Sequence, residues 1–494
     1  MNSGPERIQH ATAHALHGVA GTRQVELASR ANLPAHTLMQ RAGLSVAKLA
    51  MALAPHARTV WVACGSGNNG GDGLEAATHL KRWGKTVVVT WLGNRASAPA
   101  DAQLSCRRAV NAGLEFATEP PAHFDLCIDA LLGIGSPSAG SGPREFEGRM
   151  AQWIKLMNTA SAPVLAVDLP TGLHSDTGQI GLLCVRANFS LSLLTLKPGL
   201  FTAHGRDASG EIWLDTLGVG PNINAVPPTA WLSGKPAHYA RTHASHKGSF
   251  GDVAVVGGAP GMTGAALLAA GAALHFGAGR VFVELLDEGA MLVDPNQPEL
   301  MFRSIDTLDI KRMTVVCGCG GADAVRQPLA RILSLAALAV IDADAINAIA
   351  KDAQLQTLLR TRARRGLQTV LTPHPLEAAR LLGASTTQVQ QDRLAAAQQL
   401  AGRFDCVVAL KGSGTVIAAP AQTPTINPTG NARLATAGTG DVLAGMVGAR
   451  LANGMARGDS AFQATCDAVH LHGLCADNWP EHRHLTAGDM VKML

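Results

Sequence analysis

The chain has 494 residues, which is more than a single hydrophobic core usually supports, so we expect two domains of ordinary size. Hydrophobic residues make up 47% of the chain and charged residues 16%, a balance that excludes extensive disorder. The net charge of +4 is small for this length and the basic residues are dispersed, so we expect no nucleic-acid partner.

The nine cysteines are scattered and odd in number, which favours reduced thiols and a cytoplasmic location. The first residues show no apolar run typical of a secretory signal. One stretch, Val253 to Gly279, has no formally charged side chain and is long enough to cross a bilayer. A glycine- and proline-containing break at 257–261 instead predicts a buried strand, a turn and a buried helix, and no membrane partner.

Short Val-, Ile- and Leu-rich runs alternate with longer helical stretches, which predicts an α/β fold of two three-layer αβα domains, each with a parallel sheet. The strands predicted in the first half are Thr59–Cys64, Thr86–Leu92, Leu126–Asp129, Pro163–Asp168 and Ser190–Leu196. Those in the second half are Val253–Val256, Arg280–Glu284, Thr314–Cys317, Ala337–Ile341, Thr369–Thr372 and Cys406–Leu410. Prolines and polar residues break this rhythm at 223–244, so we predict domains at 1–222 and 245–494 joined by a linker.

The first predicted strand runs into Gly65-Ser66-Gly67-Asn68-Asn69-Gly70-Gly71-Asp72-Gly73. This loop satisfies G-x-G-x-x-G between a strand and a helix, which is typical of a Rossmann-like dinucleotide domain. Against a dehydrogenase, Asp72 would stand where a pyrophosphate rests and would repel it. Arg95 after the second strand leaves an NADP-specific dehydrogenase open, and such a turn can also serve tight packing alone.

Later strands of this half also end in polar residues. Asp129 and Asp168 stand at the carboxyl ends of two predicted strands, and Lys197 follows a third. Because those ends line the ligand crevice of an open parallel sheet, we expect the three to meet there. Oxygens of Asn69, Asp129 and Thr171 would suit a hard cation.

Together with Leu38-Met39-Gln40-Arg41-Ala42-Gly43, these motifs resemble the NAD(P)H-hydrate epimerase family over about residues 20–220. The resemblance implies epimerisation of hydrated NADH and NADPH (NADHX and NADPHX), with Asn69, Asp129 and Thr171 as potassium ligands. Two loops and one carboxylate are implied to bind the substrate: Asn68, Asn69, Gly70, Gly71, Asp72, Gly133, Ile134, Gly135, Ser136, Pro137, Ser138, Ala139 and Asp168. Thr171 stands where the family commonly has Ser, and Ile134 where it commonly has Thr.

Epimerisation at C6 of a hydrated nicotinamide opens and closes a C–O bond with movement of a proton, so it needs a positioned acid–base group. We nominate Asp168 for this role and Lys197 as the second candidate. A carboxylate that only caps the neighbouring loop is the alternative for Asp168.

In the second half, Gly438-Thr439-Gly440-Asp441 runs directly into a buried helix. Free N–H groups at a helix start can hold a transferred phosphoryl group, and Asp441 could remove the proton from the attacking hydroxyl. A simple N-cap is the alternative role of this Asp. Further strand ends carry Asp342 and Asp344, which could hold Mg²⁺ or cap a helix, and His374, which lies between two prolines.

With Ser245-His246-Lys247-Gly248 and Pro298-Glu299-Leu300-Met301, these motifs resemble the ribokinase-like fold and, more closely, its nucleotide-dependent NAD(P)HX dehydratases over about residues 240–494. The resemblance implies that ADP, with Mg²⁺, phosphorylates the 6-hydroxyl and that phosphate then leaves. It implies that the hydrated nucleotide contacts Ala265, Gly320, His374 and Asp441, and that the AMP part contacts Lys411, Gly412, Ser413, Gly414, Thr415 and Gly440. One turn, Cys317-Gly318-Cys319-Gly320-Gly321, departs from the family's usual Gly-Pro-Gly-Leu-Gly.

The second half alone would also fit a small-molecule kinase for a vitamin precursor, and the first half could be a Rossmann-like binding module. The fusion of the two patterns favours a repair enzyme for NADHX and NADPHX. The acids Asp129 and Asp168 favour catalysis because a pure binding module has no need for buried acids. We also expect a homo-oligomer.

Overall fold

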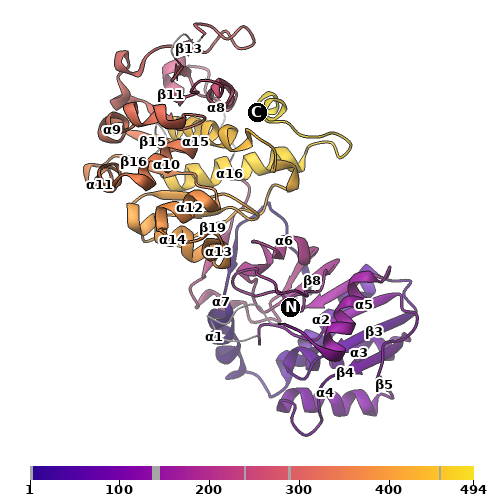
Figure 1. The fold of residues 1–494 in the computed structure, drawn as a ribbon. Helices are drawn as coiled ribbons and strands as arrows, with labels where there is room; N and C mark the ends of the chain where they lie inside the picture. Colours follow the sequence, from indigo (N-terminus) through magenta and orange to yellow (C-terminus); the bar gives the residue numbers. More distant parts are fainter. Residues whose placement is uncertain (1–3, 136–144, 238–240, 288–290, 456–457) are drawn as a thin grey trace. The chain divides into compact units, whose positions relative to one another are not determined.

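The computed structural model describes residues 4–135, 145–237, 241–287, 291–455 and 458–494 (Figure 1). The chain forms two compact units: Met1–Gln9 with His14–Trp231, and His10–Ala13 with Leu232–Leu494. Each unit has a largely parallel sheet with helices on its faces, so the predicted α/β class is confirmed. Within the described ranges, no helix is both long and apolar enough to cross a membrane.

The sheet of the first unit has the strand order β1-β9-β8-β7-β6-β3-β4-β5. All neighbouring pairs are parallel except β1 with β9. The strands are β1 Glu6–Arg7, β3 Thr59–Cys64, β4 Thr86–Trp91, β5 Glu115–Ala117, β6 Leu126–Ala130, β7 Val164–Val167, β8 Phe189–Leu193 and β9 Glu211–Asp215. The helices are α1 Val19–Arg30, α2 Thr37–Leu53, α3 Asn68–Arg82, α4 Ala100–Asn111, α5 Gly148–Thr159, α6 Gly205–Ala208 and α7 Gly220–Asn224.

Alternation along β3 gives this sheet two buried faces. Val60 and Val62 pack in one core with residues of α2, α3 and α4, whereas Trp61 and Ala63 pack with α5 in another. A strand buried on both sides needs apolar residues at every position, which is why β3 reads as a continuous apolar run. The loops that follow β3, β6, β7 and β8 therefore meet at one edge of a sheet covered on both faces.

In the second unit the strand order is β13-β12-β11-β14-β15-β16-β17-β18-β19. The pairs are parallel from β13 to β17, and β18 and β19 are antiparallel. The strands are β11 Asp252–Gly257, β12 Arg280–Leu285, β13 Met301–Phe302, β14 Thr314–Cys317, β15 Leu338–Ile341, β16 Gln368–Leu371, β17 Val407–Leu410, β18 Val416–Ala418 and β19 Thr425–Ile426. Two further short strands, β2 His14–Leu16 and β10 Ala230–Leu232, stand near the unit borders in the sequence, and β10 lies within the stretch predicted as a linker.

Helices cover both faces of this second sheet (Figure 1). One layer consists of α8 Thr263–His275, α15 Thr439–Met455 and α16 Ala461–Asp477, and α17 Ala487–Met493 packs against these helices in the same core. The other helices are α9 Arg326–Leu335, α10 Ala343–Lys351, α11 Ala353–Thr361, α12 Pro375–Leu382, α13 Thr386–Gln391 and α14 Arg393–Phe404. The uncharged stretch 253–279 forms β11, a turn and α8, which confirms the prediction of a buried strand and helix.

Candidate active sites

A cavity of about 470 Å³ opens at the carboxyl ends of the first unit's strands. Its wall includes these predicted substrate-binding residues: Asn68, Asn69, Asp72, Gly133, Ile134, Gly135 and Asp168. Gly70 and Gly71 lie behind that wall, where a Cβ on Gly70 would come within 2.0 Å of the Gly65 carbonyl oxygen and one on Gly71 within 2.6 Å of the Met39 sulfur. The predicted residues Ser136, Pro137, Ser138 and Ala139 fall outside the described residues.

The glycines of the G-x-G-x-x-G loop have different roles. A Cβ on Gly65 would lie 1.8 Å from the Leu131 carbonyl oxygen, so Gly65 and Gly70 serve the close packing of strand and helix. Gly67 has no atom within 4 Å of the corresponding position and lines the cavity. Of the three motif glycines, only Gly67 is thus open to a ligand. For Gly65 and Gly70, the interpretation that the turn serves tight packing is correct.

Asp168 and Lys197 form a buried ion pair in the cavity wall. The Lys197 ammonium donates to Asp168 Oδ1 and, at 2.7 Å, to the Leu193 carbonyl oxygen. Asp168 Oδ1 also accepts from the Leu193 N–H at 3.3 Å, and Oδ2 accepts from the Ile134 N–H at 3.2 Å. The two acid–base candidates are therefore hydrogen-bonded to each other. The N–H groups that Asp168 caps account for only some of its contacts, since it also binds the Lys197 ammonium.

The backbone at Asp168 is held in a conformation that non-glycine residues rarely adopt. Its φ of 70° is left-handed, and β7 ends at the residue before it. Such a conformation costs on the order of 1–3 kcal/mol and persists only where the surroundings impose it. Here it turns the carboxylate from the strand end into the cavity wall.

Asp129 is fully buried and bonded to Thr171. Asp129 Oδ1 accepts from the Thr171 hydroxyl at 2.7 Å and Oδ2 from the Thr171 N–H at 2.8 Å. Burial raises the pKa of Asp129 to about 6, although these hydrogen bonds and one from the Leu131 N–H oppose the rise. Thr171 Oγ1 in turn accepts from the Leu132 N–H at 3.0 Å, so its hydroxyl retains the contacts open to a Ser.

Within the described part of the chain, the side-chain amide of Asn69 is buried and has no hydrogen-bond partner at either atom. A Cβ placed on Gly133 would lie 3.0 Å from both Asn69 Oδ1 and Asp168 Oδ2. The absence of a side chain at Gly133 therefore keeps the space between these oxygens open. Asn69, Asp129 and Thr171 all adjoin the segment 131–133, and they offer only oxygens to a cation.

One expectation about Asp72 is wrong. Helix α3 begins at Asn68, so Asp72 lies beyond its first turn and not at the N-terminal anion position. Burial raises the pKa of Asp72 well above its ordinary value, and the charge of Asp168 raises it further. A carboxyl with a raised pKa carries its negative charge less readily, which weakens the electrostatic objection to a dinucleotide in this cavity.

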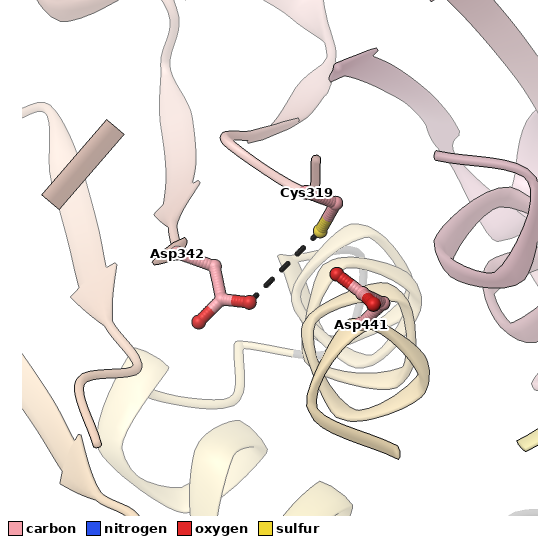
Figure 2. Close-up of side chains that lie close together, drawn as sticks. All are labelled: Cys319, Asp342 and Asp441. Atoms are coloured by element: carbon pink, nitrogen blue, oxygen red, sulfur yellow. Dashed lines mark hydrogen bonds between the residues drawn. The ribbon is translucent and has the colours of Figure 1, made fainter. Parts of the chain in front are cut away.

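The second unit brings together side chains that follow its strands and begin α15 (Figure 2). Lys411 Nζ and the Thr372 hydroxyl each donate to Asp342 Oδ1 at 2.7 Å. The Cys319 sulfur lies 4.0 Å from Asp342 Oδ2, and one ligand atom each of Cys319, Asp342 and Asp441 lies within 4.8 Å of the others. In this unit too, polar side chains that follow the carboxyl ends of parallel strands lie close together.

Asp441 lies in the first turn of α15, which begins at Thr439, so the N-cap interpretation is wrong. Burial raises the pKa of Asp441 to about 6 and the charge of Asp342 adds to the rise, while Cys319 and Lys411 oppose it. A carboxylate with that pKa is ionised at neutral pH and is still basic enough to take a proton. The adjoining Thr439 carbonyl is held at 2.9 Å by Nε2 of the buried His472.

Lys411 is oriented and charged by its neighbours. Burial alone would lower its pKa, but Asp342 and Glu377 outweigh burial and raise it. A Cβ on Gly440 would lie 3.4 Å from Lys411 Nζ, so these two predicted nucleotide-binding residues are adjacent. The buried Arg393 guanidinium holds the backbone at this position by donating to the Leu410 carbonyl at 3.1 Å and to the Lys411 carbonyl at 3.2 Å.

The remaining residues of the predicted AMP set form one turn between β17 and β18. Gly412, with φ 140°, has room for no side chain because a Cβ would lie 2.8 Å from Arg393 Nη1. The Thr415 hydroxyl donates to the Gly412 carbonyl at 3.3 Å, while Ser413 is exposed and Gly414 adopts φ 65°. This turn follows Lys411 directly.

Three other predicted contact residues, Ala265, Gly320 and His374, are engaged in packing or in helix capping. Gly320, with φ 59°, approaches α8 so closely that a Cβ would lie 2.9 Å from the Ala265 Cβ. His374 caps α12: Nδ1 accepts from the Leu376 N–H at 3.1 Å, so Nε2 carries the proton and meets Glu377 Oε1 at 3.1 Å. Both ring nitrogens of His374 are therefore engaged within α12.

Sequence reasoning left Cys319 and Thr372 out of the site. Both follow strands, β14 and β16, and the rule that found Asp129 would have found them. The sequence allows Asp342 either to hold Mg²⁺ or to cap a helix. Its side chain makes no capping hydrogen bond to α10 and instead accepts a hydrogen bond from Lys411. Asp344, the second carboxylate weighed, accepts from the Ala322 N–H at 2.8 Å.

Two family models match the chain. One, described as YjeF-related protein N-terminus, covers residues 35–199, and one described as NAD(P)H-hydrate dehydratase covers residues 253–493. The bifunctional NAD(P)H-hydrate repair enzyme of Escherichia coli (strain K12) is 33% identical over 97% of this chain and 91% of its own length. That of Coxiella burnetii is 34% identical over 96% of this chain and 97% of its own. A solved ADP/ATP-dependent NAD(P)H-hydrate dehydratase from Bacillus subtilis, co-crystallised with ATP and Mg²⁺, covers 51% of this chain and 91% of its own, with 30% identity and a TM-score of 0.44.

Proposed function

Because the chain belongs to the family of the bifunctional NAD(P)H-hydrate repair enzymes, we propose that it repairs hydrated nicotinamide nucleotides in two steps. The first unit interconverts the R and S epimers of NADHX and NADPHX, and the second dehydrates the S epimer to NADH or NADPH while ADP becomes AMP and phosphate. The observation that carries this proposal is the near-complete match to relatives named bifunctional NAD(P)H-hydrate repair enzymes, in a chain whose two units each have a polar site at their strand ends.

In the first unit, the Asp168–Lys197 pair supports acid–base chemistry at C6. Asp168 lies in the cavity wall, and its bonds to Lys197 and to two N–H groups fix its orientation. Either member can take or give the proton that moves as the C–O bond opens and closes, because the two are hydrogen-bonded to each other. The substrate contacts are proposed for the wall residues Asn68, Asn69, Asp72, Gly133, Ile134 and Gly135.

The residues around 131–133 fit the potassium ion that the epimerase resemblance implies. Asn69 has an unpartnered buried amide among the described residues, and Asp129 and Thr171 add a carboxylate and a hydroxyl. An all-oxygen set of this kind suits a hard cation. A bound K⁺ would neutralise Asp129 and satisfy the Asn69 carbonyl, and the protein atoms would hold the segment 131–133 in place.

In the second unit, Asp441 is proposed to take the proton of the 6-hydroxyl as that oxygen attacks the terminal phosphoryl group of ADP. AMP leaves, and the new C6 phosphate ester then loses phosphate from C6 and a proton from C5, which forms the ring double bond; phosphate is a better leaving group than hydroxide. Free N–H groups at the start of α15 and the ammonium of Lys411 are placed to offset the charge on the phosphoryl group. Gly440, adjacent to Lys411, and the 411–415 turn are proposed to hold the AMP part.

Magnesium fits this second site through oxygen donors. Mg²⁺ would offset the charge on the phosphates of the nucleotide, and Asp342 offers carboxylate oxygens beside α15 while Asp441 stays free to act as the base. ADP is our proposed co-substrate. We also propose a cytoplasmic location, which the nine unbridged cysteines support, and a homo-oligomer.

A repair assay tests the proposal. Mixed epimers of NADHX are incubated with the full chain, K⁺, Mg²⁺ and either ADP or ATP, while dihydronicotinamide absorbance and both epimers are followed. We expect absorbance to return and both epimers to be consumed. No return with either nucleotide would refute the dehydratase activity, and persistence of one epimer at the spontaneous rate would refute the epimerase activity.

The vitamin-precursor kinase remains the alternative that this assay excludes or supports. Such a kinase would transfer phosphate to a stable hydroxyl and release a phosphorylated product. No phosphorylated product should accumulate in the repair reaction, because the phosphate is eliminated. Phosphorus NMR of the reaction mixture distinguishes the two outcomes.

A further inference from the structure

We propose that Cys319, Asp342 and Asp441 form a binding site for Zn²⁺ or a similarly thiophilic divalent cation, and that its occupancy inhibits the second unit. The binding site stands on the geometry alone, whereas the inhibition rests on the proposed dehydratase function. The two parts can therefore fail separately.

Three elements bring the ligand atoms together. Cys319 follows β14, Asp342 follows β15 and Asp441 lies in the first turn of α15. Figure 2 shows the two carboxyl groups on either side of the Cys319 sulfur. One ligand atom from each residue lies within 4.8 Å of the others, so a cation among them could reach all three with small side-chain rotations.

The Asp342 oxygen that faces the Cys319 sulfur is available to ligate a cation. Its Oδ1 accepts from Lys411 and from Thr372, each at 2.7 Å. Its Oδ2 has, among the described residues, only the distant contact of 4.0 Å to the Cys319 sulfur. Asp342 is only 1% exposed, so this oxygen is a buried acceptor that lacks a full hydrogen bond.

The sulfur decides which metal fits. Mg²⁺ requires oxygen donors in near-octahedral geometry, whereas Zn²⁺ combines a thiolate with carboxylates at four-coordinate sites. Three protein ligands would leave a fourth position for water or a phosphate oxygen. Cys319 lies in the turn Cys317-Gly318-Cys319-Gly320-Gly321 that follows β14, so a strand-end turn of this unit supplies the soft ligand.

One feature makes such a cation a reversible occupant. The Lys411 ammonium adjoins Asp342 and repels a second positive charge. Affinity should therefore be weaker than at a structural zinc site.

Inhibition would follow from the same contacts. A carboxylate that ligates Zn²⁺ cannot accept a proton from the 6-hydroxyl, so metal binding would remove the proposed base, Asp441. Lys411 would also lose part of its attraction to Asp342, because that carboxylate would be shared with the metal.

Direct binding is measured first, on the full-length chain freed of metal. Co²⁺ serves as the spectroscopic probe because ligation by Cys319 gives a thiolate-to-cobalt charge-transfer band, and Zn²⁺ then displaces it in titrations with excess Mg²⁺ present. We expect Cys319→Ala to abolish the band and to weaken Zn²⁺ binding by at least about 100-fold, since losing even an outer-shell partner costs about 10–100-fold. Cys317→Ala, which removes a buried thiol two residues away that is outside the cluster, is the matched control and should keep the band.

Dehydratase inhibition is measured second, with each variant's own zinc-free rate as the reference. We expect Zn²⁺ to inhibit the wild type and Cys317→Ala, and Cys319→Ala to need at least about tenfold more Zn²⁺. A band that survives in Cys319→Ala, or no band in the wild type, would overturn the site. Normal binding with no loss of activity would overturn the inhibition only, and a chain without dehydratase activity would overturn the proposed function and leave the binding result standing.

Discussion

At the residue scale, the two units place buried carboxylates in contrasting environments. Asp168 is paired with the buried ammonium of Lys197, and Asp342 with that of Lys411. Asp129 and Asp441 instead have raised pKa values of about 6, because burial dominates their surroundings. In each unit one carboxylate is thus paired with a lysine ammonium, while another has a pKa of about 6, close to neutral pH.

Asp441 sets a first prediction. Since a base must be deprotonated and the pKa of Asp441 is about 6, dehydratase kcat/KM should rise with pH through about 6 and then level off. Asp441→Asn should lower the rate by about 10²–10⁴, the usual range for a general base. Asp344→Asn, which removes a neighbouring carboxylate bonded to the Ala322 N–H, is the control and should keep most of the rate. A rate insensitive to Asp441→Asn would contradict this role.

Asp168 sets a second prediction. Asp168→Asn keeps the shape of the side chain but removes the charge, so the epimerase should fall to the spontaneous rate while the dehydratase still consumes its own epimer. The measurement is chiral separation of the two NADHX epimers over time with ADP present. Lys197→Met should slow epimerisation as well, and it should also destabilise the chain, because it leaves a buried carboxylate without its cation. Full consumption of both epimers by Asp168→Asn would exclude it as the acid–base group.

At the element scale, close approach of helix and helix or helix and strand fixes where the site residues lie. A Cβ on Gly445 of α15 would come within 2.0 Å of the Ala269 carbonyl of α8, and one on Gly448 within 2.5 Å of a Val316 methyl of β14. The start of α15, with Asp441, is therefore held by the tight fit of this helix between α8 and the sheet.

Gly445 sets a third prediction. Gly445→Ala forces backbone apart, so we expect the melting temperature to fall by an amount that corresponds to about 1–3 kcal/mol or more. Gly402→Ala is the matched control: it lies inside α14 with nothing within 4 Å of its Cβ position, and it should stabilise the helix by about 0.5–1 kcal/mol. Scanning calorimetry compares both with the wild type. Equal melting temperatures for Gly445→Ala and wild type would show that α8 and α15 can separate at little cost.

Core strands were predictable because burial on both faces demands apolar residues throughout. Thr59–Cys64 and Thr314–Cys317 were predicted with the observed bounds. The strand predicted at Ser190–Leu196 ends instead at Leu193, because Leu194 turns to a φ of 65°. Short or half-exposed strands such as β5 and β9 were missed, since their mixed composition gives no apolar run.

The candidate sites were predictable to the extent that they lie at strand ends. This rule found Asp129, Asp168 and Lys411, whose places follow from topology alone. The raised pKa of Asp72 was not predictable, because it depends on burial by segments distant in sequence. The contact of Cys319 with Asp342 was within reach of the strand-end rule, because these residues follow the adjacent parallel strands β14 and β15.

At the scale of the whole molecule, the stability of the first unit is expected to depend on pH and on a bound cation. The pKa of Asp129 is raised from 3.8 to about 6 in the folded chain, so its contribution to stability is present at low pH and is lost as pH rises through about 6. A cation beside the ionised carboxylate would reverse that loss.

Potassium sets a fourth prediction. Replacing choline chloride by KCl at equal ionic strength should raise the melting temperature of the first unit at about pH 8 and change it less at about pH 5, where Asp129 is largely protonated. Differential scanning calorimetry resolves the effect. Asp129→Asn should abolish the dependence on K⁺, and an equal shift at both pH values would contradict a site that contains this carboxylate.

The burial of the cysteines makes their reaction with a thiol reagent a measure of unfolding. None of the nine is bridged; Cys64, Cys106, Cys127 and Cys184 are buried in the first unit, Cys317, Cys319, Cys406 and Cys466 in the second, and only Cys475 is partly exposed. A thiol reagent added to the native chain should modify Cys475 first, and the other sites only as fast as each unit unfolds. Mass spectrometry of pulse-labelled peptides would then read the two unfolding rates separately in one sample.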